Sequence, residues 1–198
     1  MIIHGMRLVV FDRMEECSEA EVSRLLPLVN AQRREQALRY KHVFGQFCCL
    51  RSWLMLADLL REESGKRQVN VSVTLRDFSY NEHGKPILDG GPYFSISHCK
   101  EAIAVAISEE PIGIDIEAIR HADDSLIERT MNEPERKMIR ASEDRDRAFT
   151  RLWTQKEAVI KCVGTGIESF EQLQNLPLSE FRIQTTETEK YIYSIAYG

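Results

Sequence analysis

The chain has 198 residues, of which 43% are hydrophobic and 29% are charged, and its formal net charge is −5. A chain of this length forms one packed domain or two half-size lobes, since typical domains contain about 100–200 residues. The negative net charge argues against nucleic acid as the main partner, because proteins that bind a polyanion are usually basic. An anionic ligand is therefore expected to meet a local cluster of basic side chains.

The cysteines and the N-terminal residues indicate a cytosolic protein. The cysteines are odd in number and form no C-x-x-C pair, so we expect reduced thiols and neither a disulfide framework nor a zinc site. The first residues lack the charged start and long apolar stretch of a signal peptide. We find no apolar run of the roughly 18 residues that a membrane span requires. We therefore expect a soluble, cytoplasmic protein that does not associate with a membrane.

The first part of the chain is predicted to form a strand and then three helices. The strand covers Ile2–Phe11. The sequence Ser18-Glu-Ala-Glu21 is a capping box for a short helix that Pro27 ends, and Asn30 can cap a second, basic helix. From Gly45 to about Arg61 the apolar residues recur at helical spacing, which predicts a long core helix.

Strand patterns dominate the middle of the chain. Apolar and polar residues alternate from Val69 to Leu75, and the sequence Asn81–Pro86 is typical of a turn. Three more strands are expected at Tyr93–Ser97, Ala102–Ser108 and Ile112–Glu117.

Helices return in the last third of the chain and are followed by a hairpin. The helices are predicted at about Ser125–Met131, Glu135–Ala141 and Asp144–Val163, and Gly164 suits a left-handed C-terminal cap. The predicted hairpin strands are Phe181–Thr185 and Tyr191–Tyr197. This order favours an α+β fold with two similar lobes, residues 1–110 and residues 111–198.

Two acidic residues lie on one face of a predicted strand. Because residues i and i+2 of a strand project to the same side, Asp115 and Glu117 point together while Ile114 and Ile116 face the core. Two adjacent carboxylates repel each other unless a cation lies between them, and oxygen ligands suit Mg²⁺. A solvated acidic strand face would show the same pattern, so both interpretations stay open here.

A third carboxylate occurs in the segment Trp153–Lys161. Glu157 and Lys161 are spaced i, i+4 and share one face of the predicted helix, either as an ordinary surface ion pair or as part of a site. Lys156 precedes Glu157, points in another direction and is expected to be solvated.

Several other polar residues could bind an anion. His98 could donate to a phosphate oxygen, with a hydroxyl donor from Ser95 or Ser97, and Lys85 lies in a Gly-Lys-Pro turn that would present its ammonium. An ordinary histidine and a solvated turn lysine are the alternatives. The predicted basic helix could contact phosphate or be a solvated face, and it carries Arg33, Arg34 and Arg39.

Four segments in this order form a recognisable set. They are Gly84-Lys-Pro86, Phe94-Ser-Ile-Ser-His98, Pro111-Ile-Gly-Ile-Asp-Ile-Glu117, and Trp153–Lys161 followed by Gly164-Thr-Gly166. Together they resemble the 4′-phosphopantetheinyl transferases of the Sfp type. The resemblance implies a pseudo-dimer of two α/β lobes, with coenzyme A bound in the cleft between them.

The resemblance also implies an activity that needs a metal ion and a protein partner. The 4′-phosphopantetheine group of coenzyme A would pass to a serine of an apo acyl or peptidyl carrier protein, as in a holo-[acyl-carrier-protein] synthase, and adenosine 3′,5′-bisphosphate would leave. Such an enzyme serves fatty acid or secondary-metabolite biosynthesis, and we expect a monomer. By position, the ligands of Mg²⁺, which Mn²⁺ could replace, would be Asp115, Glu117 and Glu157.

The same resemblance implies individual roles in catalysis and in coenzyme A binding. Glu157 would accept the serine proton, directly or through water, while His98 and Lys161 would hold the pyrophosphate. Lys85 would meet the phosphate on the adenosine ribose. The remaining coenzyme A contacts would come from Ser97, Arg33 and Arg34.

The chain departs from the family pattern in its first helical segment. Gln36 and Cys49 stand where a lysine and a hydroxyl residue are expected, which is why Arg33 or Arg34 would substitute as phosphate ligands. Glu135 falls near another acidic position of the family and is a further candidate for handling water or a proton.

Two other classes of function use the same residues. Another Mg²⁺-dependent phosphoryl-transfer enzyme, such as a small phosphodiesterase, would usually have several histidine ligands, whereas the five histidines of this chain are scattered. A non-catalytic homologue that binds coenzyme A is the other alternative. The presence of all three carboxylates and of Lys161 argues against such a loss of activity.

Overall fold

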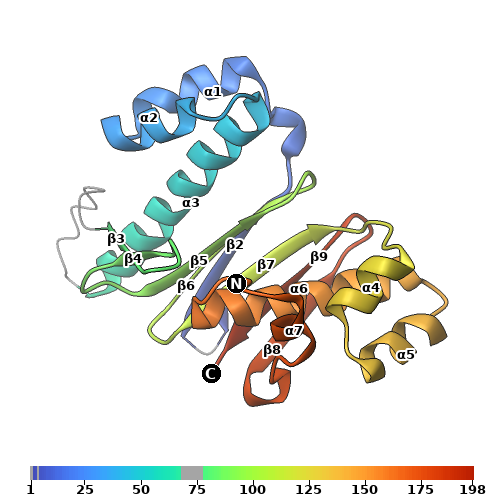
Figure 1. The fold of residues 1–198 in the computed structure, drawn as a ribbon. Helices are drawn as coiled ribbons and strands as arrows, with labels where there is room; N and C mark the ends of the chain where they lie inside the picture. The colour runs from blue at the N-terminus through green and yellow to red at the C-terminus, as the bar shows by residue number, and fades with distance from the viewer. Residues whose placement is uncertain (1, 4, 68–77) are drawn as a thin grey trace.

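The computed structural model describes residues 2–3, 5–67 and 78–198 of the chain. Helices and strands are mixed throughout this part, as the sequence predicted (Figure 1). The strand expected at Val69–Leu75 lies outside the described residues.

The N-terminal half combines a four-stranded sheet with three helices. The sheet has the strand order β1-β2-β6-β5, and β3 and β4 form a separate pair. The strand expected at Ile2–Phe11 is in fact two antiparallel strands, with Gly5 at φ 80° between them. The elements are β1 (Ile2–Ile3), β2 (Met6–Phe11), α1 (Glu19–Leu25), α2 (Ala31–Leu38), α3 (Val43–Arg67), β3 (Phe78–Tyr80), β4 (Pro86–Leu88), β5 (Tyr93–His98) and β6 (Ile103–Ser108).

The C-terminal half contains a three-stranded sheet, order β7-β9-β8, and four helices. The predicted hairpin and the three predicted helices are confirmed, and Gly164 ends α6 at φ 85°. The short helix α7 was not expected. The elements are β7 (Ile112–Ala118), α4 (Asp124–Thr130), α5 (Glu133–Ala141), α6 (Arg145–Val163), α7 (Phe170–Gln174), β8 (Arg182–Glu187) and β9 (Tyr191–Tyr197).

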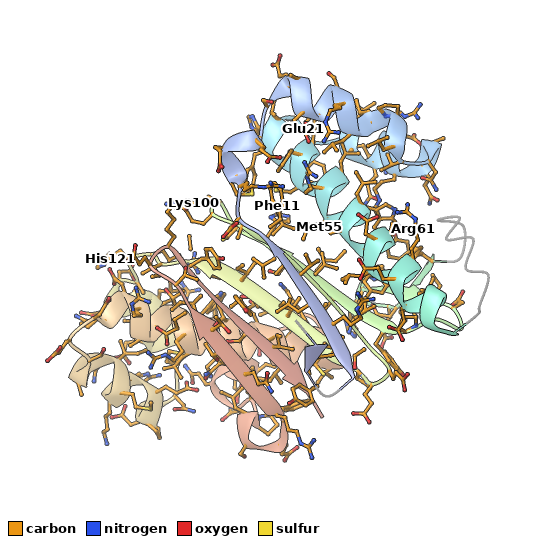
Figure 2. The ribbon with its side chains drawn as sticks, turned by 180° about the vertical axis from the view of Figure 1, so that it is seen from behind. Phe11, Glu21, Met55, Arg61, Lys100 and His121 are labelled. Atoms are coloured by element: carbon orange, nitrogen blue, oxygen red, sulfur yellow. The ribbon has the colours of Figure 1, made fainter. Side chains whose placement is uncertain are left out.

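The two sheets share one apolar core, and helices cover their outer sides. Alternate residues of β2 and β6 pack with residues of β7 and β9 in a single buried cluster. The other face of β2, β5 and β6 packs against α1, α2 and α3, and Figure 2 shows Phe11 of β2 and Met55 of α3 where these elements meet. On the far side, α6 packs on β7 and β9.

One stretch of helix α3 is long and apolar enough to pass the test for a membrane span, although no such stretch was expected from the sequence. Its stretch Val43–Glu63 has a mean hydropathy of 1.3, which by length and composition alone is enough to cross a membrane. Inside the protein, 56% of this apolar stretch is buried. Its buried residues include Phe47, Leu50 and Leu56, which belong to the core cluster with β5 and β6.

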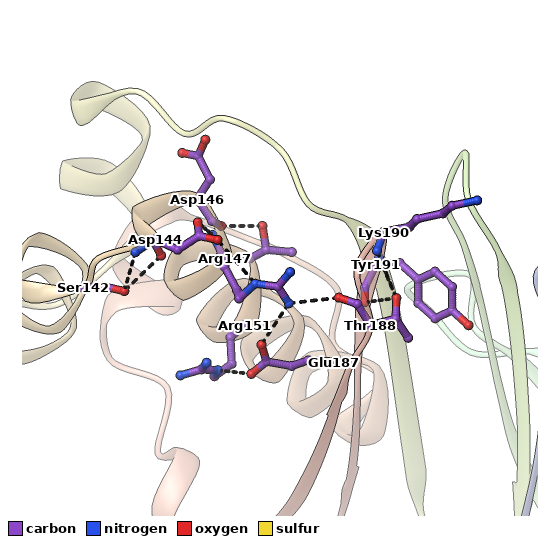
Figure 3. Close-up of polar contacts among 10 residues, drawn as sticks. Ser142, Asp144, Asp146, Arg147, Arg151, Glu187, Thr188, Lys190 and Tyr191 are labelled. Atoms are coloured by element: carbon purple, nitrogen blue, oxygen red, sulfur yellow. Dashed lines mark hydrogen bonds and ion pairs between the residues drawn. The ribbon is translucent and has the colours of Figure 1, made fainter.

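A hydrogen bond and two salt bridges connect the first turns of α6 to the hairpin of β8 and β9 (Figure 3). Arg147 donates from Nη1 to the carbonyl of Thr188 over 2.9 Å and pairs with Glu187 over 3.3 Å. Arg151 pairs with the same Glu187 carboxylate over 2.5 Å. These contacts fix the axis of α6 relative to the sheet that it covers.

Gly113 allows α6 to approach β7 closely. A Cβ atom at this position would lie 1.9 Å from the carbonyl oxygen of Ala158 and 2.3 Å from the backbone nitrogen of Cys162. Only a residue without a side chain fits such an approach of two backbones. The face of β7 that carries the acidic residues is therefore held directly against α6.

Candidate active site

The acidic residues of β7 face α6, as the strand pattern predicted. Ile114 and Ile116 are fully buried in the core that the two sheets share, while Asp115 lies on the opposite face of the strand and is 3% exposed. Glu117 follows on the same face and is half-buried. The predicted orientation of the two carboxylates is confirmed.

The two oxygens of Asp115 have different surroundings. Oδ1 accepts hydrogen bonds from Ser97 Oγ at 2.9 Å and from Lys161 Nζ at 2.7 Å. Oδ2 is buried and has no hydrogen-bond partner among the described residues. Because a buried carboxylate oxygen without a partner is costly, this atom is suited to bind a cation.

Lys161 crosses from α6 to β7. Its ammonium contacts Asp115 Oδ1 at 2.7 Å and Ser97 Oγ at 2.9 Å. The ordinary alternative for this residue, a surface ion pair with Glu157, is therefore not what the structure shows. Lys161 instead brings a positive charge to the carboxylate on the neighbouring strand.

Glu157 and Glu117 lie in the field of Asp115. Burial, followed by the negative charge of Asp115, raises the pKa of Glu157 to about 7, with Lys161 acting in the opposite direction. Burial and then Asp115 also raise the pKa of Glu117. The three carboxylates thus repel one another, which a divalent cation would relieve.

The carboxylate oxygens of Asp115, Glu117 and Glu157 are the ligand type that Mg²⁺ prefers. In the structure these oxygens do not surround a common point. Within residues 2–3, 5–67 and 78–198, no three histidine, cysteine or acidic side chains form a preassembled metal site. Asp115 Oδ2, which has no hydrogen-bond partner in the described part of the chain, could supply one hard oxygen ligand. Glu117 and Glu157 would have to turn toward it on binding.

His98 lies at the end of β5, next to α3. Its ring meets the ring of Phe44 edge-on, with 5.9 Å between the centroids. His98 is exposed to solvent at the protein surface. Neighbouring atoms still remove part of the water around its ring, and this desolvation, followed by the positive charge of Lys161, lowers the pKa of His98. A neutral imidazole near Lys161 can donate one hydrogen bond.

Lys85 holds the end of α6. The turn predicted at Asn81–Pro86 is confirmed, since Asn81 Oδ1 accepts from the backbone nitrogen of Lys85 at 2.8 Å. The Lys85 ammonium donates to the carbonyls of Lys161 and Cys162, at 2.5 Å and 3.3 Å. Burial lowers the pKa of Lys85. The ammonium therefore caps a helix C-terminus, where a cation is favourable.

A cavity of about 300 Å³ lies between β5 and α6. Its lining includes Lys85, Ser95, Glu157 and Lys161. A second cavity, of about 620 Å³, also includes Lys85 in its lining and is lined mainly by the segment 85–94, with the end of α6 and Gly198. The smaller cavity holds polar groups that could fix an anionic ligand beside the carboxylates.

Comparison with known proteins agrees with this geometry. Residues 111–196 match the model of the 4′-phosphopantetheinyl transferase superfamily. The 4′-phosphopantetheinyl transferase gsp of Aneurinibacillus migulanus is 30% identical over 167 residues, which are 83% of this chain and 65% of that protein. The C-terminal half of the chain is therefore similar to the 4′-phosphopantetheinyl transferase superfamily.

Two further relatives of the superfamily differ in how much of the chain they match. The 4′-phosphopantetheinyl transferase Sfp of Bacillus subtilis (strain 168) is 28% identical over 171 residues, which are 84% of this chain and 71% of Sfp. The 4′-phosphopantetheinyl transferase AcpT of Salmonella typhimurium (strain LT2) is 37% identical over 94 residues, or 44% of this chain and 49% of AcpT. The chain spans about two thirds of the length of the Aneurinibacillus member.

The arginines expected to bind coenzyme A have other contacts in the structure. Arg34 donates to the backbone carbonyls of Leu26 and Val29, at 3.2 Å and 3.5 Å. The guanidinium of Arg33 lies 3.4 Å from the centroid of the Trp53 ring, a cation–π contact. Both side chains thus brace α2 against its neighbours, and the structure does not bring them to the carboxylates.

Lys156 corrects an expectation from the sequence. The side chain expected in solvent is fully buried, and its ammonium pairs with Glu135 Oε1 at 2.9 Å and donates to the carbonyl of Leu173 at 2.6 Å. The other oxygen of Glu135 accepts from the backbone nitrogen of Asn132 at 2.8 Å. Both carboxylate oxygens have structural partners, so we no longer assign water or proton handling to Glu135.

Sequence reasoning missed one residue that shapes this site. Gly113 sets the distance between α6 and β7, and its position in the strand that carries both acidic residues is a usable signal. Ser97, which the sequence offered as a phosphate donor, contacts Asp115 and Lys161 in the structure.

Proposed function

We propose that this protein transfers the 4′-phosphopantetheine group of coenzyme A to a serine hydroxyl of an apo acyl or peptidyl carrier protein. The main support is Asp115 Oδ2, which is buried without a hydrogen-bond partner among the described residues and lies beside the Lys161 ammonium. It lies in the segment that matches the model of the 4′-phosphopantetheinyl transferase superfamily. The relatives named above carry this activity in their names.

Mg²⁺, or Mn²⁺ in its place, would be held by Asp115, Glu117 and Glu157. Their oxygens are the ligand type that Mg²⁺ prefers, and their mutual repulsion favours a divalent cation. When bound, the ion supplies charge neutralisation of the pyrophosphate, which opens its β-phosphorus to attack.

Lys161 and His98 would orient the pyrophosphate. Lys161 is already placed at the carboxylates, and His98 lies close enough for the Lys161 charge to lower its pKa. These two groups would hold the phosphate oxygens. Positioning and charge stabilisation account for most of the catalysis in phosphoryl transfer.

The carrier supplies the nucleophile, and Glu157 would take its proton. The serine oxygen forms a bond to the β-phosphorus, the bond from that phosphorus to the bridging oxygen breaks, and adenosine 3′,5′-bisphosphate leaves with that oxygen. In the metal-free protein the pKa of Glu157 is raised to about 7, and a carboxyl with such a pKa is a suitable base near neutral pH. Bound metal would lower this pKa. The proton would reach Glu157 either directly or through a water molecule.

The proposal includes the arrangement that the sequence implied. Residues 1–110 and 111–198 would be two similar lobes of a cytoplasmic monomer, with coenzyme A in the cleft between them. The cavity between β5 and α6 and the core that joins the two sheets support such a cleft. Carrier proteins are the expected macromolecular partner, without nucleic acid or membrane.

The test is a mass measurement on the carrier protein. Purified protein is mixed with coenzyme A, Mg²⁺ and a panel of apo acyl, peptidyl and aryl carriers, and the intact mass of each carrier is read. We expect a phosphopantetheine adduct on at least one carrier and its loss with Glu157→Ala, while the exposed control Glu143→Ala keeps it. No adduct on any carrier, or an adduct that is undiminished with Glu157→Ala, would overturn the proposal.

A further inference from the structure

The edge strands β5 and β7 belong to different sheets and are joined by serine side chains. Ser95 Oγ accepts a hydrogen bond from the backbone nitrogen of Ile114 at 3.0 Å, and Ser97 Oγ accepts one from Ile116 at 3.3 Å. In the described part of the chain, β5 pairs with β6 and β7 pairs with β9. The two hydroxyls therefore satisfy backbone donors of β7 that face the edge of the other sheet.

Ser97 makes further contacts that Ser95 does not share. Its hydroxyl donates to Asp115 Oδ1 at 2.9 Å and accepts from Lys161 Nζ at 2.9 Å, in addition to its contact with Ile116. A serine hydroxyl has one proton and two lone pairs, so these three bonds use its full capacity. Ser97 consequently has no proton left to donate to a phosphate while it holds Asp115.

These contacts determine which oxygen of Asp115 accepts hydrogen bonds. Ser97 and Lys161 both bind Oδ1, which fixes the carboxylate in one orientation. Oδ2 is thereby left buried and without a partner among the described residues. A hydrogen bond to one ligand oxygen is how residues outside a metal site usually orient its ligands.

We propose that Ser97 is a positioning residue, whose hydroxyl holds Asp115 and Lys161 so that Asp115 Oδ2 is presented to the metal ion. The inference rests on the proposed function only in its use of Asp115 as a metal ligand. It replaces the role of Ser97 as a direct ligand of coenzyme A. Ser97 acts through Asp115 and touches neither substrate nor metal.

Ser95 provides a matched control on the same strand. Both serines are buried, at 5% and 7% exposure, and both accept a hydrogen bond from the backbone of β7. Ser95→Ala therefore removes one link between the strands but leaves the orientation of Asp115 unchanged. Ser97→Ala removes a comparable link together with the contacts to Asp115 and Lys161.

The experiment measures Mn²⁺ binding by electron paramagnetic resonance, with and without coenzyme A, for the wild type and both variants. We expect Ser97→Ala to weaken Mn²⁺ binding about 10-fold or more, since loss of such a partner typically costs about 10–100-fold in metal affinity. Without coenzyme A, Ser95→Ala should stay within about twofold of the wild type in Mn²⁺ affinity by the same argument. Ser97→Thr, which keeps the hydroxyl, should restore most of the affinity, and thermal melts check that each variant is folded.

A kinetic measurement separates positioning from a purely structural role. The Mg²⁺ concentration for half-maximal rate should rise in Ser97→Ala, while kcat at saturating Mg²⁺ falls much less. If Ser97→Ala does not fold, Ser97→Cys takes its place, because a thiol fills the site and bonds only weakly.

Equal Mn²⁺ affinity in the Ser97 and Ser95 variants would overturn the inference, as would a wild type that binds no Mn²⁺ under either condition. The carrier mass assay on the wild type judges the proposed function separately. An active wild type whose Mn²⁺ binding does not depend on Ser97 would contradict positioning alone. Mn²⁺ binding that depends on Ser97 in a protein that modifies no carrier would contradict the transferase alone.

Discussion

The ammonium nitrogen of Lys156 lies 2.9 Å from Oε1 of Glu135, and the lysine side chain is completely buried. Lys156 directly precedes Glu157 on α6, whereas Glu135 lies in the first turn of α5. The pair therefore ties α5 to the helix that presents Glu157 and Lys161 to the acidic strand.

Replacing Lys156 by methionine should strongly destabilise the protein. The substitution leaves the Glu135 carboxylate buried without its counter-charge, and breaking such a pair typically costs about 3–5 kcal/mol. Urea denaturation of the wild type and the variant measures the change. The double variant Lys156→Met/Glu135→Gln should recover part of the loss, because a neutral amide can still accept from the backbone of Asn132. Equal stability of the single and double variants would show that charge burial is not the cause.

The stability of the metal-free protein should fall as the pH rises from about 4.5 to about 7. In the folded protein the pKa of Glu157 is raised to about 7 from its ordinary value of 4.5, so the folded state holds this proton more tightly than the unfolded state. The stabilising proton is lost progressively across this window. The full shift corresponds to roughly 3 kcal/mol, and partial solvent access reduces it to about 1–2 kcal/mol.

The measurement is urea denaturation in a chelator at several pH values. Glu157→Gln should make the free energy of unfolding less dependent on pH between about pH 5 and pH 7, because it removes one titrating group. The exposed control Glu143→Gln should leave it unchanged. A wild type whose stability rises over this window, with no difference in Glu157→Gln, would contradict the repulsion among the three carboxylates.

Gly113→Ala should separate α6 from β7. Its Cβ would lie 1.9 Å from the carbonyl oxygen of Ala158, and backbone atoms on both sides cannot move away cheaply. Overpacking of this kind typically costs about 1–3 kcal/mol, and here it should also reduce carrier modification because Glu157 moves away from Asp115. Gly198→Ala is the control, since its Cβ would be 3.4 Å from Phe181. A Gly113→Ala protein with normal stability and rate would show that the close approach is unimportant.

Lys85→Met tests whether this lysine caps α6 or binds the adenosine phosphate. Loss of the hydrogen bonds to the carbonyls of Lys161 and Cys162 should lower the stability by about 1 kcal/mol. The exposed Lys100→Met, which loses a surface pair with Glu101, should change little. Denaturation and the KM for coenzyme A are measured together. Unchanged stability with a raised KM would restore the role as a phosphate ligand that the family resemblance implied.

Local patterns predicted the parts of the site that lie within one element. Strand alternation placed Asp115 and Glu117 on one face and Ile114 and Ile116 in the core, and the structure confirms this. The predicted helix with its Gly164 cap is also confirmed. These features depend on backbone periodicity, which is visible in a single sequence.

Contacts between distant segments were not predictable in the same way. Residue type suggested that Lys156 is solvated, yet it continues the buried stripe of Phe149, Leu152 and Val159 at helical spacing. That stripe was a signal for burial, but it did not reveal Glu135 as the partner. For Lys85, the sequence showed the charge and the rigid turn but not that its ammonium contacts the end of α6.

The most direct test of the whole account compares the wild type with Asp115→Asn in the carrier assay, with Mg²⁺ titrated and the intact mass of the carrier followed over time. We expect a phosphopantetheine adduct with the wild type that requires Mg²⁺. We expect a rate at least about 100-fold lower with Asp115→Asn, because a direct metal ligand should matter more than the residues that orient it, whose loss costs about 10–100-fold in metal affinity. Equal modification by the two proteins, or no adduct with the wild type on any carrier, would contradict it.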